Sequence, residues 1–133
     1  RFRETYYWDS HWCVLGLIAS GMTSTAEGVV RNLLHLVACH GFVPNGARCY
    51  YLNRSQPPVL AASVRAVCAS HDEAHYNKDD DGRRNQRNDE DDAGVNRNRE
   101  RVRAARCFGS PAAIALARDA LPLLLREHAY LTR

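Results

Sequence analysis

The 133-residue chain has 45% hydrophobic residues, enough for a packed core within one domain or part of one. A net charge of +3 with 25% charged residues gives no strong attraction to nucleic acid or to an anionic membrane, and no apolar run approaches the length of a membrane span. The five cysteines include no CxxC pair, which argues against a disulfide framework and against a zinc site.

Two amphipathic helices are predicted first, over residues 9–23 and 25–39. The apolar stripe of the first consists of Trp12, Leu15, Ala19 and Met22. The second follows the i, i+3, i+4, i+7 pattern with Ala26, Val29, Val30, Leu33, Leu34 and Val37. Ser24 and Glu27 form a capping-box pattern at its start, and Gly41 lies just past its end, where a left-handed residue is favoured. The short link predicts an antiparallel helical hairpin.

A loop and a third helix are predicted next. Residues 42–56 contain a Pro-Asn-Gly turn signal and mix aromatic with polar side chains, which predicts a rigidly held loop. Residues 57–70 are predicted to form a helix, because the two prolines at its start suit a first helical turn. Its expected buried side is formed by Leu60, Val64, Val67 and Cys68.

The remaining third of the chain changes character twice. Residues 71–106 are rich in Asp, Glu, Arg and Asn, with too few aliphatic residues to offset ordering entropy, so we predict a disordered insertion. Residues 110–132 are predicted to be a helix capped by Ser110, in which Pro122 allows either a kink or two shorter helices. Its expected buried face is formed by Ile114, Ala117, Leu121, Leu124, Leu125 and His128. The predicted fold class is mainly α.

This pattern divides the chain into three parts. We expect a helical segment with polar loops over residues 1–70, the charged insertion over 71–106, and a helical continuation of the same domain over 107–133. The arginines of the insertion are interleaved with acidic residues and lack stacking aromatics, so a solvated linker is favoured over a nucleic-acid contact. Translated non-coding sequence is a third reading of it. Neither cellular compartment nor oligomeric state has a signature in the sequence.

Two segments have the composition of a sugar-binding site. Residues 1–12 and 43–58 combine Arg, Asp, Asn and Gln with aromatic residues over short spans. A pyranose offers hydroxyl groups that pair with fixed polar side chains and C–H faces that lie on aromatic rings. The alternative from composition alone is that these are polar loops that only fix helix ends.

The same two segments resemble the trehalase family of glycoside hydrolases. The opening RFRETYYWDSHW is similar to the first family signature, with His11 in place of the usual tyrosine. Its matching residues are Arg1, Phe2, Glu4, Tyr6, Trp8 and Asp9. The later PNGARCYYLNRSQPP resembles a second family segment, with Ala47 in place of a glycine. The closing LPLLLREHAYL is similar to a family helix, though less specifically.

The resemblance implies an incomplete (α/α)6 toroid that binds trehalose, uses no cofactor and hydrolyses its substrate by an inverting mechanism. It implies seven substrate-binding residues, namely Arg1, Trp8, Asp9, Asn45, Arg54, Ser55 and Gln56. In the family the catalytic acid is an aspartate in a Gly-Trp-Asp context, and the base is a glutamate near the C-terminal end. Neither context occurs in this sequence, so no catalytic residue is assigned and the chain alone is expected to be inactive.

Structural roles stay open for several of these residues. Asp9 can cap the first helix, Asn45 can serve only its turn, Arg54 can pair with a helix-end carbonyl, and Trp8 can be a core aromatic. A degenerate, non-catalytic sugar-binding or interaction module derived from a trehalase is the alternative function.

Overall fold

The computed structural model describes residues 4–84 and 110–132, with side chains described for 4–75 and 110–132. Its elements are α1 (Tyr7–Ala19), α2 (Thr23–His40), the short 3-10 helix η1 (Cys49–Tyr51), α3 (Leu60–Arg84) and α5 (Pro111–Leu131). The described residues contain no β-strand, so the predicted mainly α fold class is confirmed.

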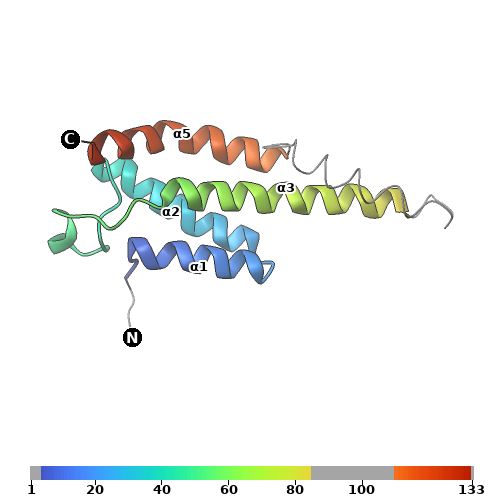
Figure 1. Cartoon of the computed structure of the whole chain (residues 1–133), viewed down its shortest axis with the longest axis horizontal. Coiled ribbons are helices and arrows are strands. Elements are labelled where there is room, and N and C mark those ends of the chain that lie inside the picture. The colour runs from blue at the N-terminus through green and yellow to red at the C-terminus, as the bar shows by residue number, and fades with distance from the viewer. Residues whose placement is uncertain (1–3, 85–109, 133) are drawn as a thin grey trace.

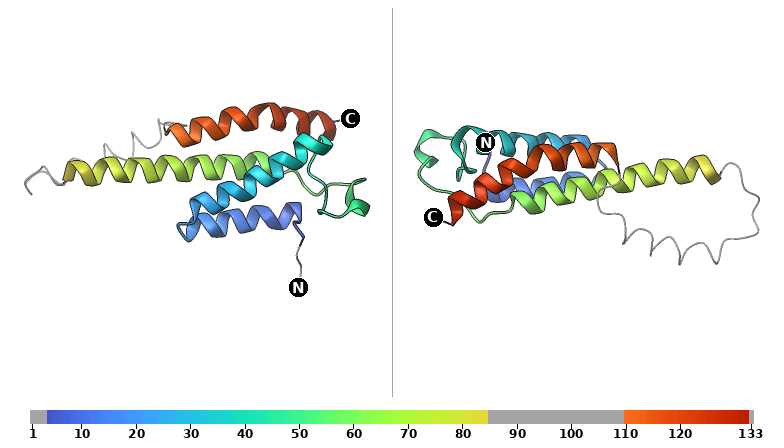
Figure 2. Two further views of the ribbon diagram at one scale, coloured as in Figure 1. Left: turned by 180° about the vertical axis from the view of Figure 1, so that it is seen from behind. Right: turned by 90° about the horizontal axis from the view of Figure 1, so that it is seen from above.

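The helices form two antiparallel pairs that pack together. α1 and α2 make the predicted hairpin, and the tight turn between them uses Gly21 at φ 73°. α5 runs back along α3, and α2 contacts both of them (Figure 1). The start of α1, the end of α2, the start of α3, the end of α5 and the long loop before α3 lie at one end of the bundle. At the other end, α3 extends well beyond its neighbours (Figure 2).

The hydrophobic core lies between the four helices, and two predicted helix faces are confirmed there. α2 buries Ala26, Val30, Leu33, Leu34 and Val37. α3 buries Leu60, Val64, Val67 and Cys68. Gly41 ends α2 in the left-handed conformation with φ 86°, and the Ser110 side chain caps α5 by accepting from the Ala113 N–H. Both caps agree with the sequence analysis.

The predicted buried faces of α1 and α5 are mostly wrong, although Ala117 and Leu124 of the predicted α5 face are partly buried against the core. Trp12 is 54% exposed, and α1 instead buries Tyr7, Ser10 and Val14. Leu121 and Leu125 are 59% and 62% exposed, whereas α5 buries Ala113, Leu116, Ala120 and Glu127. Small alanines let α5 approach α3 closely, and the buried Cys68 Sγ lies 3.6 Å from the Ala113 carbonyl oxygen. Both helices carry more than one apolar stripe, and periodicity does not state which stripe has a partner.

Several predicted helix boundaries also change. α1 begins before Asp9, so Asp9 is not its N-cap, and α2 begins at Thr23, so Ser24 lies inside the helix and forms no capping box. α5 continues through Pro122 as one helix. α3 does not end at residue 70 but continues to Arg84, so the predicted division at 70 falls within a helix. The rest of the predicted disordered insertion, residues 85–106, lies outside the described residues.

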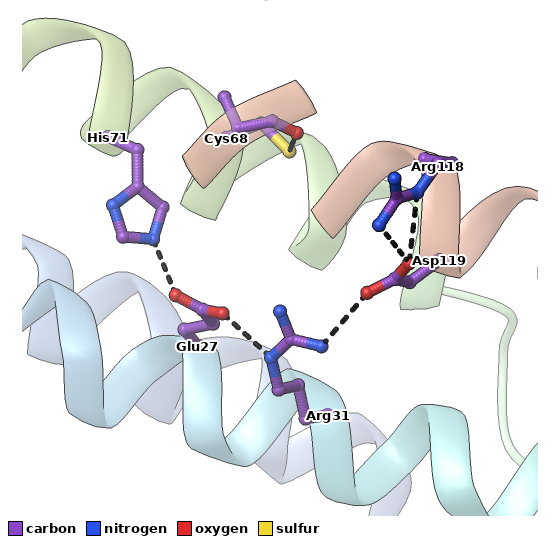
Figure 3. Close-up of polar contacts among 7 residues, drawn as sticks. Glu27, Arg31, Cys68, His71, Arg118 and Asp119 are labelled. Atoms are coloured by element: carbon purple, nitrogen blue, oxygen red, sulfur yellow. Dashed lines mark hydrogen bonds and ion pairs between the residues drawn. The ribbon is translucent and has the colours of Figure 1, made fainter. Parts of the chain in front are cut away.

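The middle of the bundle carries a group of charged side chains, which we call the ion cluster: Glu27, Arg31, His71, Arg118 and Asp119. Glu27 lies 2.7 Å from both Arg31 Nε and His71 Nε2, and Arg31 lies 3.5 Å from Asp119 Oδ2 (Figure 3). These contacts connect α2 with α3 and α5. His71, the first residue past the predicted end of the third helix, already has a partner on α2.

Candidate functional site

The end of the bundle where the long loop lies contains part of the first segment singled out in the sequence and the whole of the second. We call it the loop end: residues 4–8 and 41–60. These two segments are joined by an isolated β-bridge between Tyr6 and Gly46 and by two backbone hydrogen bonds. Tyr7 N–H donates to the Asn45 carbonyl at 3.4 Å, and Ala47 N–H donates to the Thr5 carbonyl at 3.2 Å. The loop is therefore fixed to the start of α1.

Gly46 makes this close approach possible. A Cβ atom at this position would lie 2.8 Å from Tyr51 Cδ2 and 3.3 Å from Tyr6 Cε1. Contacts below 3.0 Å are not tolerated between real Cβ atoms and their neighbours, so any side chain here would displace an aromatic ring. The glycine of the Pro-Asn-Gly turn thus has a packing reason in addition to its turn propensity.

Trp8 and Gln56 are brought together. The Trp8 backbone N–H donates to the Gln56 side-chain oxygen at 2.9 Å. Trp8 lies in the first turn of α1, where backbone N–H groups lack helical partners, so Gln56 caps this helix from 48 residues away. The Trp8 ring is 38% exposed and contacts the Trp12 ring edge-to-face at 5.7 Å. Trp8 is therefore not a core aromatic.

Asn45, Arg54 and Ser55 lie in the same loop and share backbone contacts. Asn45 N–H donates to the Arg54 carbonyl at 2.9 Å, which closes the loop on itself. The Ser55 hydroxyl donates to the Val43 carbonyl at 2.7 Å. The exposed Arg54 guanidinium lies over the Tyr51 ring at 5.0 Å, a cation–π distance. The backbone is thus fixed, while the Arg54 charge faces solvent.

Two of the seven predicted site residues stand apart. Arg1 lies outside the described residues. Asp9 lies inside α1 and lines an open depression between α1 and α2, together with Glu4, Thr5, Tyr6, Ser10, Cys13, Val29 and Asn32. Among the described side chains, no hydrogen bond joins Asp9 to Asn45, Arg54 or Gln56. The structure therefore groups five of the predicted residues, while Asp9 lines a depression that it shares with Glu4, Thr5 and Tyr6 of the loop end.

Beneath the loop end lies a buried pair that the sequence analysis missed. The Tyr7 hydroxyl donates to Glu127 Oε1 at 2.8 Å and accepts from the N–H groups of Val59 and Leu60. Burial raises the pKa of Tyr7, and the nearby Glu127 carboxylate raises it further. Burial likewise raises the pKa of Glu127, although its hydrogen bonds oppose this. The sequence contains one sign of this burial, because Glu127 lies at helical spacing from Leu116 and Ala120, which are also buried.

A second carboxylate braces the outer side of the loop. Glu4 accepts a hydrogen bond from the Tyr6 hydroxyl and pairs with Arg48 across the bridge between the two segments. The hydrogen bond to Glu4 raises the pKa of Tyr6, so this phenol stays protonated. Among the described residues, no group of three His, Cys, Asp or Glu side chains is placed to hold a metal ion. None of the described helices has the length and apolar content of a membrane span.

Comparison with known proteins identifies the family. The family profile described as Trehalase matches residues 1–93. This chain belongs to the trehalase family. The match contains both segments of the loop end and continues past residue 70, where the third helix was predicted to end. It thus includes the part of α3 that was predicted to be disordered.

Individual trehalases align over the same region. A probable trehalase of Oryza sativa subsp. japonica is 61% identical over 64 residues, and the trehalase of Dictyostelium discoideum is 56% identical over 64 residues. Each alignment covers 48% of this chain and 11% of the relative. The human trehalase is 57% identical over 60 residues, which is 45% of this chain and 10% of the relative. The chain therefore spans only a small part of the length of these trehalases.

Proposed function

We propose that this chain is the sugar-binding portion of an α,α-trehalase, which hydrolyses trehalose to two glucose molecules. The observation that carries the proposal is the hydrogen bond from Trp8 to Gln56, because it joins the two trehalase-like segments at one site. The names of the relatives support the same substrate. The described helix pairs fit the proposal that the domain is part of an (α/α)6 toroid.

The seven proposed substrate-binding residues would contribute different kinds of contact to the sugar. The exposed face of Trp8 suits the C–H face of a glucose ring. The Gln56 side-chain oxygen accepts from the Trp8 N–H of α1, which leaves its NH2 group to donate to a sugar hydroxyl. The Arg54 guanidinium provides further donors. Asp9, Asn45 and Ser55 would add acceptors, and Arg1 a positive donor. This set binds a neutral sugar without a cofactor.

We propose that hydrolysis requires two carboxyl groups from outside this chain. An inverting glycosidase protonates the glycosidic oxygen with one acid and activates water with a base about 6.5–9.5 Å away. The sequence contexts that the family resemblance implies for that acid and base are absent from this sequence. The chain alone should therefore release no glucose from trehalose, and measurable glucose production by the purified chain would contradict the assignment.

Sugar binding can be tested with the two tryptophans, which both lie on α1. Trehalose should change the tryptophan fluorescence of the Trp12→Phe variant, in which Trp8 is the remaining indole. The matched Trp8→Phe variant retains only Trp12 and should respond less. Sucrose, another non-reducing disaccharide, is the ligand control. Equal responses to both sugars, or no response in either variant, would refute the proposed site.

Catalysis can be tested in the full-length gene product. Arg54→Ala should lower kcat/KM for trehalose by about tenfold or more, because a charge-assisted contact is lost. Arg65→Ala, on the exposed side of α3, is the control and should leave the kinetics unchanged. A full-length protein that binds trehalose but never hydrolyses it would favour the alternative, a non-catalytic sugar-binding module. Unchanged kinetics for Arg54→Ala would remove that residue from the site.

A further inference from the structure

Glu127 has an unusual position for a charged residue. It is 4% exposed, and it is the only Asp or Glu among the described side chains whose residue as a whole is buried. Burying a carboxylate is unfavourable unless hydrogen bonds compensate for the lost hydration. A leucine would pack the same site without that cost, so the carboxyl group needs a reason other than packing.

The reason lies in the hydroxyl group of Tyr7. This oxygen donates to Glu127 Oε1 at 2.8 Å and accepts from the Val59 and Leu60 N–H groups at 3.0 and 2.9 Å. One donor and two acceptor positions are the full capacity of a phenol. Glu127 Oε1 accepts this hydrogen bond, so the phenol points its hydrogen toward α5. Both lone pairs are then left for the N–H groups of Val59, just before α3, and Leu60, its first residue, where no helical partners are available.

This arrangement fixes the backbone on both sides of the Trp8–Gln56 contact. Tyr7 is the residue directly before Trp8, whose N–H donates to Gln56, and Val59 follows Gln56 by three residues. α1 and the approach to α3 are therefore held at a common point beneath the sugar site. Glu127 reaches that point from α5, 120 residues away from Tyr7.

We propose that Glu127 is a positioning residue for sugar binding. It acts through the Tyr7 hydroxyl to hold the backbone segments that present Trp8 and Gln56, and it does not touch the sugar itself. This inference rests on the proposed function. It adds α5 to a site that the sequence confines to the first 58 residues.

The test is trehalose affinity, measured by isothermal titration calorimetry on the 133-residue chain well below its melting temperature. Glu127→Gln keeps the size of the side chain, but its NH2 group can donate to the phenol oxygen, so the phenol hydrogen is no longer held toward α5. Tyr7→Phe removes only the hydroxyl. Each substitution should weaken trehalose binding about tenfold, since small displacements of binding groups are costly. The double variant should bind about as weakly as either single variant, because both act through one contact.

Asp119→Asn is the matched control. It makes the same carboxylate-to-amide change on α5, but Asp119 pairs with Arg31 in the ion cluster, so trehalose affinity should not change. If Glu127→Gln lowers the melting temperature yet binds trehalose like the unsubstituted chain, Glu127 is structural only and the inference is overturned. If Glu127→Gln does not fold, the trehalose affinity of Tyr7→Phe tests the inference by itself: affinity like that of the unsubstituted chain would overturn it. If the unsubstituted chain does not distinguish trehalose from sucrose, the proposed function fails and this role falls with it.

Discussion

The loop end and the ion cluster are built from similar side chains but held in different ways. Beneath the loop end, Glu127 is buried and hydrogen-bonded to Tyr7, and within the loop end a bridge and backbone hydrogen bonds join two segments of the chain. In the ion cluster, Glu27 and Arg31 are partly solvated, and Asp119 is 45% exposed at its side chain (Figure 3). Exposed ion pairs contribute little to stability, whereas a buried carboxyl group without its partner is costly. The comparison indicates that side-chain and backbone positions are fixed most firmly where the sugar site is proposed.

The largest contrast is expected from two glycines. Gly46→Ala places a methyl group against Tyr51 and Tyr6 and should destabilise the fold by about 2 kcal/mol. Gly28→Ala in α2 meets nothing within 4 Å and should stabilise it by about 0.5–1 kcal/mol, because alanine is the better helix former. Chemical denaturation measures both free energies of unfolding. Destabilisation by Gly28→Ala, or a neutral Gly46→Ala, would contradict the proposed difference between the two regions.

A smaller contrast separates two helix caps. Gln56→Ala removes the acceptor of the Trp8 N–H at the start of α1, and Ser110→Ala removes the cap of α5. Each should cost about 1 kcal/mol, the usual value for a lost cap. Only Gln56→Ala should also weaken trehalose binding, which calorimetric titration of both variants would measure. Equal affinities in the two variants would mean that Gln56 stabilises the helix and does not bind sugar.

The smallest expected contrast is in how the free energy of unfolding changes with pH. Partial burial pushes the pKa of Glu27 upward, but hydrogen bonds from Arg31 and His71 outweigh it, so the pKa is lowered. Glu27 thus adds stability above the ordinary glutamate pKa, and this is lost as pH falls through the lowered value. Burial raises the pKa of Glu127, so its contribution is present below the ordinary pKa and is lost as pH rises through the raised value.

Thermal melts between pH 3 and pH 7 would reveal these opposite signs. As pH falls, the stability difference between the unsubstituted chain and Glu27→Gln should shrink. The difference between the unsubstituted chain and Glu127→Gln should grow over the same range. Both differences changing in the same direction would show that the two carboxyl groups are not held in the distinct environments described above.

Much of the local structure follows from sequence patterns. The face of α2, the left-handed cap at Gly41 and the Ser110 cap were predicted correctly, because each depends on residues within one or two helical turns. The faces of α1 and α5 were not, because the choice between apolar stripes depends on which neighbour packs against them. The buried Glu127 was missed for the same reason, since its partner is distant in the sequence.

The sequence by itself determined the mainly helical fold, most helix positions and the resemblance of two segments to trehalases, since these are properties of neighbouring residues. The tertiary structure decided that Gln56 caps α1 and that α5 supports the loop end through Tyr7. These features depend on contacts between residues 48 to 120 positions apart, and local periodicity contains no information about such pairs.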